Sequence, residues 1–171
     1  MIRKSLFVAI AISCAAPALA FATAENIYKN QNYAYKISVP RDVTIETDPP
    51  PSPQHGFAIT LGKGRSLSVD ASYDSTFLGS VEAAIRSRAD DDSISKKINP
   101  VTCNIGGLAG ERIHAEVNGQ KIDLAVAYRP NGQNIAIIYT FELDTNNESG
   151  AEDERLFQKI LTNFSLTSLP N

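Results

Sequence analysis

The sequence is poor in the residues that bind metals and form disulfides. It has no tryptophan, two cysteines and two histidines, His55 and His114. Transition-metal sites need clustered histidine and cysteine ligands, so we expect no metal and no other cofactor. Cys14 lies in the apolar N-terminal segment, and Cys103 is the only cysteine after it. A disulfide within the domain is therefore excluded, and stability must come from packing.

The sequence also lacks a hydrophobic run long enough to span a membrane. The apolar run over residues 6–12 is far below the roughly 20 residues that a spanning helix needs. It follows two basic residues and precedes two A-x-A sites ending at Ala20 and Ala24, which is the order found in a secretory signal peptide. We expect a cleavable signal peptide over residues 1–24, cut after Ala20 or Ala24. Residues 25–171 then form one periplasmic or secreted domain.

Basic residues are not in excess. The chain has 16 Lys and Arg residues against 19 Asp and Glu residues, and Arg3 and Lys4 leave with the signal peptide, so the remaining domain has a net charge of −5. Nucleic acids and anionic membranes attract basic patches rather than acidic domains. We therefore expect neither as a partner.

What the sequence does contain is a series of strand patterns. Apolar residues alternate with small or polar ones in several short runs, as in strands buried on one face. These runs are 33–39, 43–47, 57–61, 67–71 and 101–105. Residues 49–53 hold four prolines in five positions, which excludes helix and central strand and predicts a surface loop.

Two consecutive hairpins are predicted in the middle of the chain. Asn118-Gly119 is the preferred pair for a two-residue turn. Counting outwards from it places apolar residues opposite apolar ones and charges opposite countercharges. The predicted pairs are Ile113 with Leu124, Ala115 with Ile122, His114 with Asp123, and Glu116 with Lys121.

The second hairpin is predicted to turn at Asn131-Gly132. Its predicted pairs are Tyr128 with Ile135, Val126 with Ile137, Leu124 with Tyr139, and Ile122 with Phe141, all on the apolar face of the first hairpin. The last strand also carries Ala136 and Ile138 on its reverse side. That pattern predicts a central strand covered on both faces.

Two helices complete the prediction. Ser80 is an expected N-cap, and the helix after it ends in Asp90-Asp91-Asp92. A capping box of Ser149 and Glu152 begins the second helix, whose apolar stripe is Leu156, Phe157, Ile160, Leu161 and Phe164. The predicted fold class is α+β, with a central antiparallel sheet of about six to seven strands and helices packed on both faces.

The order of these elements resembles the PsbP-like superfamily. The resemblance rests on Tyr35–Pro40, on Ile138–Phe141 and on the closing segment Phe157–Leu166, and with the hairpins between them it spans nearly the whole exported chain. It implies a central antiparallel sheet with helices on both faces and a role in binding other proteins without catalysis. Some bacterial relatives are similar to periplasmic immunity proteins that neutralise secreted toxins.

Two sets of residues could support catalysis. His114 opposite Asp123 is either a catalytic pair or a cross-strand contact on a polar strand face, and the neighbouring charge pair favours the contact. Cys103 is either a nucleophile or a buried inert thiol, and its phase with Val101 and Ile105 favours burial. The chain has no G-x-S-x-G elbow that would mark a nucleophilic serine.

Two acidic clusters raise the question of calcium. Asp144, Asn146 and Glu148 alternate before a helix, but Ser149 stands where an EF-hand loop needs glycine and Arg155 where it needs glutamate. Asp90, Asp91 and Asp92 form the other cluster, and solvated acids are the expected state of both.

The sequence therefore predicts a non-catalytic periplasmic module that binds a protein, either an envelope protein or a secreted toxin that it inhibits as an immunity protein. Acidic loops would attract a basic partner surface. The candidate binding residues are Asp90, Asp91, Asp92, His114, Asp123, Asp144, Asn146 and Glu148. The alternatives are a small hydrolase that uses His114 and Asp123 or Cys103, and an accessory protein that binds calcium or a small ligand.

Overall fold

The computed structural model describes residues 25–47, 54–76, 78–89, 100–117, 120–131, 136–145 and 150–169. Five predicted features lie outside these ranges. They are the signal peptide, the proline segment 49–53, the cluster Asp90–Asp92, the turn Asn118-Gly119, and the loop residues Asn146, Glu148 and Ser149. In the described parts of the chain, no helix is long and apolar enough to cross a bilayer.

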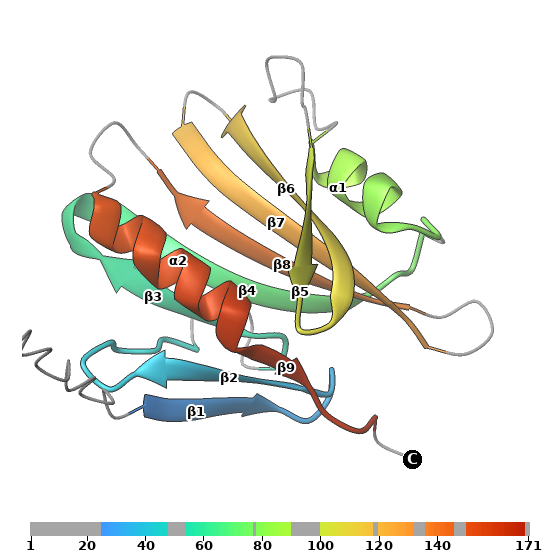
Figure 1. Ribbon diagram of the computed structural model, residues 1–171, viewed down its shortest axis with the longest axis horizontal. Coiled ribbons are helices and arrows are strands. Elements are labelled where there is room, and N and C mark those ends of the chain that lie inside the picture. The colour runs from blue at the N-terminus through green and yellow to red at the C-terminus, as the bar shows by residue number, and fades with distance from the viewer. Residues whose placement is uncertain are drawn as a thin grey trace, which may run out of the picture.

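The chain forms two antiparallel sheets where one was predicted (Figure 1). The smaller sheet has the order β1-β2-β9, with β1 at Glu25–Asn30, β2 at Tyr35–Pro40 and β9 at Phe164–Leu166. The larger sheet has the order β3-β4-β8-β7-β6-β5. Its strands are β3 (Phe57–Leu61), β4 (Arg65–Tyr73), β5 (Val101–Ile105), β6 (Leu108–Val117), β7 (Gln120–Pro130) and β8 (Ala136–Asp144). The predicted central place of β8 is confirmed, since it lies between β4 and β7.

Three short segments differ from the sequence prediction. β1 and β9 were not predicted, and β9 takes Phe164 out of the predicted helix. The predicted strand 43–47 is wrong: its one ladder contact is an isolated bridge between Glu46 and Ala58. A 3-10 turn at Gly62–Gly64 joins β3 to β4.

The first hairpin has the predicted register. Ile113 lies opposite Leu124, His114 opposite Asp123, and Glu116 opposite Lys121. The second hairpin does not. Val126 pairs with Thr140, Tyr128 with Ile138, and Pro130 with Ala136, whereas a two-residue turn at Asn131-Gly132 would place Pro130 opposite Gln133.

The reason for the second register is the size of the side chains. Phe141 lies opposite Ala125, and Tyr139 opposite Ala127. The predicted register would have put both rings against larger aliphatic residues. An odd shift in register also exchanges the two faces of a strand, so Tyr139 and Phe141 lie on the face opposite to Leu124.

Two apolar clusters result from this alternation. The larger cluster contains Ala125 and Ala127 of β7 together with residues of β2, β3, β4, β8, β9 and α2 (Ala151–Asn163), among them Phe157, Ile160 and Leu161 of the predicted helix stripe. The smaller cluster contains Ile122, Leu124 and Val126 of β7, with Ala84 and Ile85 of α1 (Val81–Ala89). Adjacent residues of β7 therefore enter different clusters, as the alternation of a strand requires.

The two helices begin in different ways. The predicted cap of α1 is confirmed, because the Ala83 N–H donates to Ser80 Oγ at 3.1 Å. The predicted capping box of α2 is wrong. Its N-cap is Gly150, which has no side chain to accept a hydrogen bond, and Glu152, Asp153 and Glu154 fill the first turn, where the helix dipole favours acids.

Candidate functional site

The predicted pair of His114 and Asp123 connects β6 to β7, as the register requires. The His114 Nδ1 atom is 3.5 Å from Asp123 Oδ2, but the two side chains differ in environment. The side chain of His114 is 78% exposed, whereas that of Asp123 is 0% exposed. The prediction of a surface contact is thus correct for the histidine and wrong for the aspartate.

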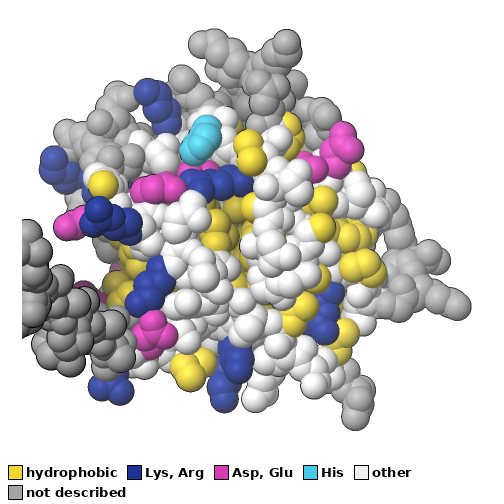
Figure 2. Space-filling model, viewed as in Figure 1, with side chains coloured by type: hydrophobic (Ala, Val, Ile, Leu, Met, Phe, Trp, Pro, Cys, Tyr) yellow, Lys and Arg dark blue, Asp and Glu magenta, His cyan; other side chains and the backbone are white. Residues whose placement is uncertain are grey.

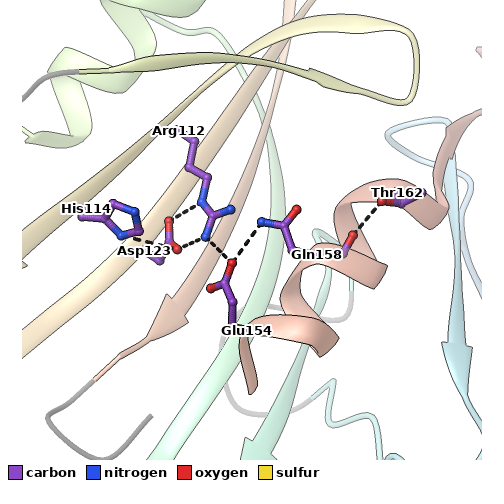
Figure 3. Close-up of polar contacts among 6 residues, drawn as sticks. All are labelled: Arg112, His114, Asp123, Glu154, Gln158 and Thr162. Atoms are coloured by element: carbon purple, nitrogen blue, oxygen red, sulfur yellow. Dashed lines mark hydrogen bonds and ion pairs between the residues drawn. The ribbon is translucent and has the colours of Figure 1, made fainter. Parts of the chain in front are cut away.

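The buried Asp123 pairs with an arginine that the sequence analysis did not single out (Figure 3). Arg112 Nε donates to Asp123 Oδ1 at 2.7 Å, and Arg112 Nη2 donates to Asp123 Oδ2. Such a two-point contact is the strongest form of an arginine–carboxylate pair. The hydrogen bonds to Asp123 raise the pKa of Arg112 above its ordinary value.

The same arginine also binds α2. Arg112 Nη2 donates to Glu154 Oε1 at 2.8 Å, and Gln158 Nε2 donates to the same oxygen at 3.0 Å. Partial burial opposes the ionisation of Glu154, but the hydrogen bonds from Arg112 and Gln158 outweigh it, and its pKa lies below the ordinary value. The guanidinium carbon lies 5.1 Å from the centre of the Phe157 ring, within the range of a cation–π contact.

A second arginine forms an ion pair with the first turn of α2. Arg65 of β4 lies beside Asp153, with Nη2 and Oδ2 2.7 Å apart. Both ion pairs are largely shielded from solvent on the arginine side. Asp153 and Glu154, two acids in the first turn of α2, are therefore engaged within the molecule.

This geometry supports a structural role for Asp123. In a catalytic pair the carboxylate orients the histidine, and the histidine in turn contacts a nucleophile. Here both oxygens of Asp123 are bonded to Arg112. Within the ranges that the structure covers, His114 makes no hydrogen bond to a serine, threonine or cysteine. We conclude that Arg112 and Asp123 anchor α2 to β6 and β7.

The other predicted site residues are not brought together with this pair. Asp144 is buried at the end of β8, opposite Ile122, so it belongs to the other face of the sheet from Asp123. No group of three or more potential metal ligands occurs among the described residues. The remaining candidates, Asp90–Asp92, Asn146 and Glu148, lie outside the described ranges.

Cys103 is half-buried, which meets the prediction of a buried thiol only in part. It lies on the edge strand β5, between Val101, which is 66% exposed, and the fully buried Ile105. Burial raises the pKa of the thiol. Since the thiolate is the reactive form, this environment disfavours a nucleophilic role.

A second candidate surface lies on the sheet face that carries α1. This helix contacts β6 and β7, and the polar residues begin on the neighbouring strands. We call this surface the acidic face, and it consists of Ser68, Asp70 and Ser72 of β4 with Thr140 and Glu142 of β8. Ser68 pairs with Glu142 and Asp70 pairs with Thr140 across the strands. The even-numbered positions of β4 and β8 include no lysine or arginine.

The opposite side of the molecule has a different charge pattern. Figure 2 shows the side that carries α2, where Lys and Arg side chains lie among Asp and Glu side chains. A mixed surface of this kind produces little field of one sign. The sequence held a signal for the acidic face, because Ser66, Ser68, Asp70 and Ser72 alternate with buried apolar residues.

No family model matches the chain, and no curated protein matches its sequence. Several solved structures are nevertheless similar in fold. LpqN of Mycobacterium tuberculosis, described as involved in cell envelope biogenesis, matches with a TM-score of 0.56 and 12% identity over 88% of each chain. Cyanobacterial PsbP from Synechocystis sp. PCC 6803 matches with a TM-score of 0.54 and 14% identity over 90% of this chain and 98% of that one.

A third similar structure is the Ran-binding protein Mog1p of Saccharomyces cerevisiae. It matches with a TM-score of 0.54 and 11% identity, over 85% of this chain and 96% of that one. At these identities the likeness concerns the fold alone. The chain therefore has the fold of PsbP and Mog1p, as the resemblance in its sequence implied.

Proposed function

We propose that this protein is a non-catalytic binding module that acts outside the cytoplasm by recognising another protein. The observation that carries the proposal is the acidic face, a partly exposed surface with carboxylates and hydroxyls on neighbouring strands. The pairing of Asp123 with Arg112 supports the non-catalytic role, because the carboxylate of the one predicted histidine–carboxylate pair is used to hold α2 against the sheet. Fold likeness to a Ran-binding protein and to a protein of cell envelope biogenesis adds support by analogy.

The partner that this surface fits is a basic protein surface. Opposite charges steer two proteins together and exclude partners of the wrong sign. Asp70, Asp74 and Glu142 supply negative charge on or beside the acidic face. In its finer form the proposal is that the partner is an envelope protein or a secreted toxin, and that the module inhibits the toxin as an immunity protein.

The location is part of the proposal. Residues 1–24 form the export signal, and residues 25–171 are the working domain in the periplasm or outside the cell. N-terminal sequencing of the secreted or periplasmic protein should begin at Phe21 or Glu25. Protein that stays in the cytoplasm with residues 1–24 attached would contradict it.

The binding role is tested by affinity capture from periplasmic extract with the exported form as bait. We expect a basic protein to be retained at low salt and released as salt rises, since exposed charge pairs are screened. The variant Asp70→Lys/Glu142→Lys should lose this protein. As a matched control, Glu152→Lys changes an exposed acid on α2 and should retain it. Equal capture by the double variant and the wild type would refute the assignment to the acidic face.

A further inference from the structure

A pocket of about 180 Å³ lies between the acidic face and the segment that leads into α1. Two kinds of residue line it. Asp70, Ser72 and Thr140 form a polar end on the sheet, and Leu78, Ala84 and Ile138 form an apolar wall. The pocket therefore has one charged end and one apolar side.

The polar end contains the hydroxyl of Thr140, which borders the open space of the pocket. Thr140 is 6% exposed, and its hydroxyl makes no hydrogen bond to any residue that the structure describes. The hydroxyl is not one of the fully buried polar atoms, so it is open to a ligand in the pocket. Asp70, the cross-strand partner of Thr140, places a carboxylate beside it in the same pocket. A ligand group rich in hydrogen-bond donors would satisfy both.

Asp74 shapes the pocket without being available to a ligand. Its Oδ1 accepts hydrogen bonds from the backbone N–H groups of Thr76 and Leu78, and its Oδ2 accepts from Gly79 N–H and from the Tyr128 hydroxyl at 2.9 Å. These bonds fix the segment that carries Leu78. Asp70 is thus the carboxylate left for recognition, and its Oδ1 lies 3.7 Å from His55 Nδ1.

The size of the pocket limits the ligand. A volume of 180 Å³ is about six water molecules at roughly 30 Å³ each. Pockets for drug-sized ligands measure roughly 300–1,000 Å³. A bare metal ion is disfavoured too, because the described residues include no cluster of three potential ligands. The remaining class is a single side chain or a small organic cation.

We propose that this pocket receives an alkylammonium group, and, resting on the proposed function, that the group is a lysine side chain of the partner protein. An ammonium has three donors and no acceptor. The Asp70 carboxylate and the hydroxyls of Ser72 and Thr140 provide three acceptors on the sheet. The methylene stem of a lysine buries against apolar surface while its head remains polar, and Leu78, Ala84 and Ile138 provide that surface.

The test is an NMR titration of the purified protein with N-acetyl-lysine methylamide. The control ligand is the matching derivative of 2-aminoheptanoic acid, in which a methyl group replaces the ammonium. We expect the backbone amides of Asp70, Ser72 and Thr140 to shift with the lysine probe and not with the neutral one. Equal shifts with both probes would overturn the proposal.

Two variants locate the binding. Asp70→Asn keeps the shape and removes the charge, and it should weaken binding of the lysine probe about fivefold, as for a partly exposed charge pair. Thr140→Val removes the hydroxyl and should weaken binding in the same direction. Asp42→Asn, an exposed acid that does not line the pocket, should bind as the wild type. A dispersed amide spectrum verifies that each variant is folded, and unchanged binding by folded Asp70→Asn would refute the assignment.

The source of the ammonium group is decided separately. If Asp70→Asn loses the lysine probe and n-butylamine but still captures the protein partner, the pocket serves a free amine, and its assignment to a partner lysine is wrong. If no variant and no wild-type bait captures a partner while the probe still binds, the proposed function fails and the alkylammonium pocket stands. Loss of both probe and partner in Asp70→Asn supports both proposals together.

Discussion

At the scale of single residues, the charge pairs of this protein differ in how much they contribute to its stability. Arg112 with the fully buried Asp123 is an internal pair, whereas His114 beside it is mostly exposed. A buried carboxylate that loses its partner retains the penalty of desolvation. An exposed histidine is not desolvated, so its removal leaves no comparable penalty. The two neighbours of Asp123 are therefore expected to respond very differently to substitution.

Substitution of Arg112 by alanine should destabilise the protein by about 3–5 kcal/mol, because it leaves Asp123 buried and unpaired. Urea unfolding followed by circular dichroism measures this change. His114→Ala serves as the control and should change the free energy of unfolding by less than about 0.5 kcal/mol. A small effect of Arg112→Ala would mean that water reaches Asp123 readily, against the burial described above.

A second prediction concerns pH and Asp74. Burial alone would raise the pKa of Asp74, but hydrogen bonds from Leu78, Tyr128, Gly79 and Thr76 outweigh it and hold the pKa below its ordinary value. A carboxyl whose pKa is lower in the folded state contributes stability above the unfolded pKa and loses it as pH falls through the folded one. Stability should thus decrease as pH falls below about 4.

The measurement is urea unfolding at a series of pH values for the wild type and for Asp74→Asn. The variant cannot ionise at this position, so its stability should depend less steeply on pH below about 4. Tyr128→Phe removes one donor to Asp74 and should give an intermediate slope. Identical slopes for all three proteins would show that Asp74 is not the group responsible.

At the scale of elements, the two hairpins show what a sequence pattern can determine. β6 is polar on one side and apolar on the other, so only one register pairs like with like, and the prediction was correct. β8 is buried on both faces for most of its length. A strand of that kind has no alternation to fix its register. The register of β8 is instead explained by the fit of Tyr139 and Phe141 against two alanines. The apolar pattern of a single sequence does not reveal such a fit.

The turn between β5 and β6 carries a prediction at this scale. Gly106 and Gly107 both have positive φ, but their surroundings differ. A Cβ on Gly106 would lie 2.5 Å from Phe164 Cδ1 of β9, whereas a Cβ on Gly107 would meet nothing within 4 Å. Both alanine variants incur backbone strain. Only Gly106→Ala also displaces the Phe164 ring.

We therefore expect Gly106→Ala to be less stable than Gly107→Ala by about 1–3 kcal/mol, the usual penalty of overpacking. Chemical denaturation of the two variants side by side gives the difference, in which the strain common to both largely cancels. If the two variants are equally stable, the turn can move away from β9 without a loss of stability. The contact of Gly106 with Phe164 would then contribute little to the free energy of unfolding.

At the scale of the whole molecule, the sequence predicted the antiparallel β-rich fold but not its division into two sheets. The strands that make the smaller sheet are distant in sequence, because β1 and β2 come first among the strands and β9 comes last. Their partner choice depends on contacts distant in sequence. The candidate site was also predicted only in part. The position of His114 opposite Asp123 followed from the local register of the hairpin. The burial of Asp123 was not predicted, because it depends on α2, which is distant in sequence.

The two sheets share one core, and this leads to a prediction about cooperativity. Phe164 of β9 stacks on Tyr35 of β2 with ring centres 5.5 Å apart, and it meets Tyr139 and Phe141 of β8 edge-on at 5.0 and 5.3 Å. The Tyr139 hydroxyl also donates to the Tyr33 carbonyl at 2.7 Å, between the two sheets. Neither sheet can lose these contacts without exposing the core of the other.

Calorimetry of a protein comprising residues 25–171 should therefore show one unfolding transition in which both sheets melt together. Phe164→Ala should cost about 3–5 kcal/mol and lower the single Tm by about 10 °C for a domain of this size. Ile27→Ala is the control, since that side chain on β1 is largely exposed and should leave Tm nearly unchanged. Two separate transitions, with the β1-β2-β9 sheet melting first in Phe164→Ala, would show that the sheets are independent units.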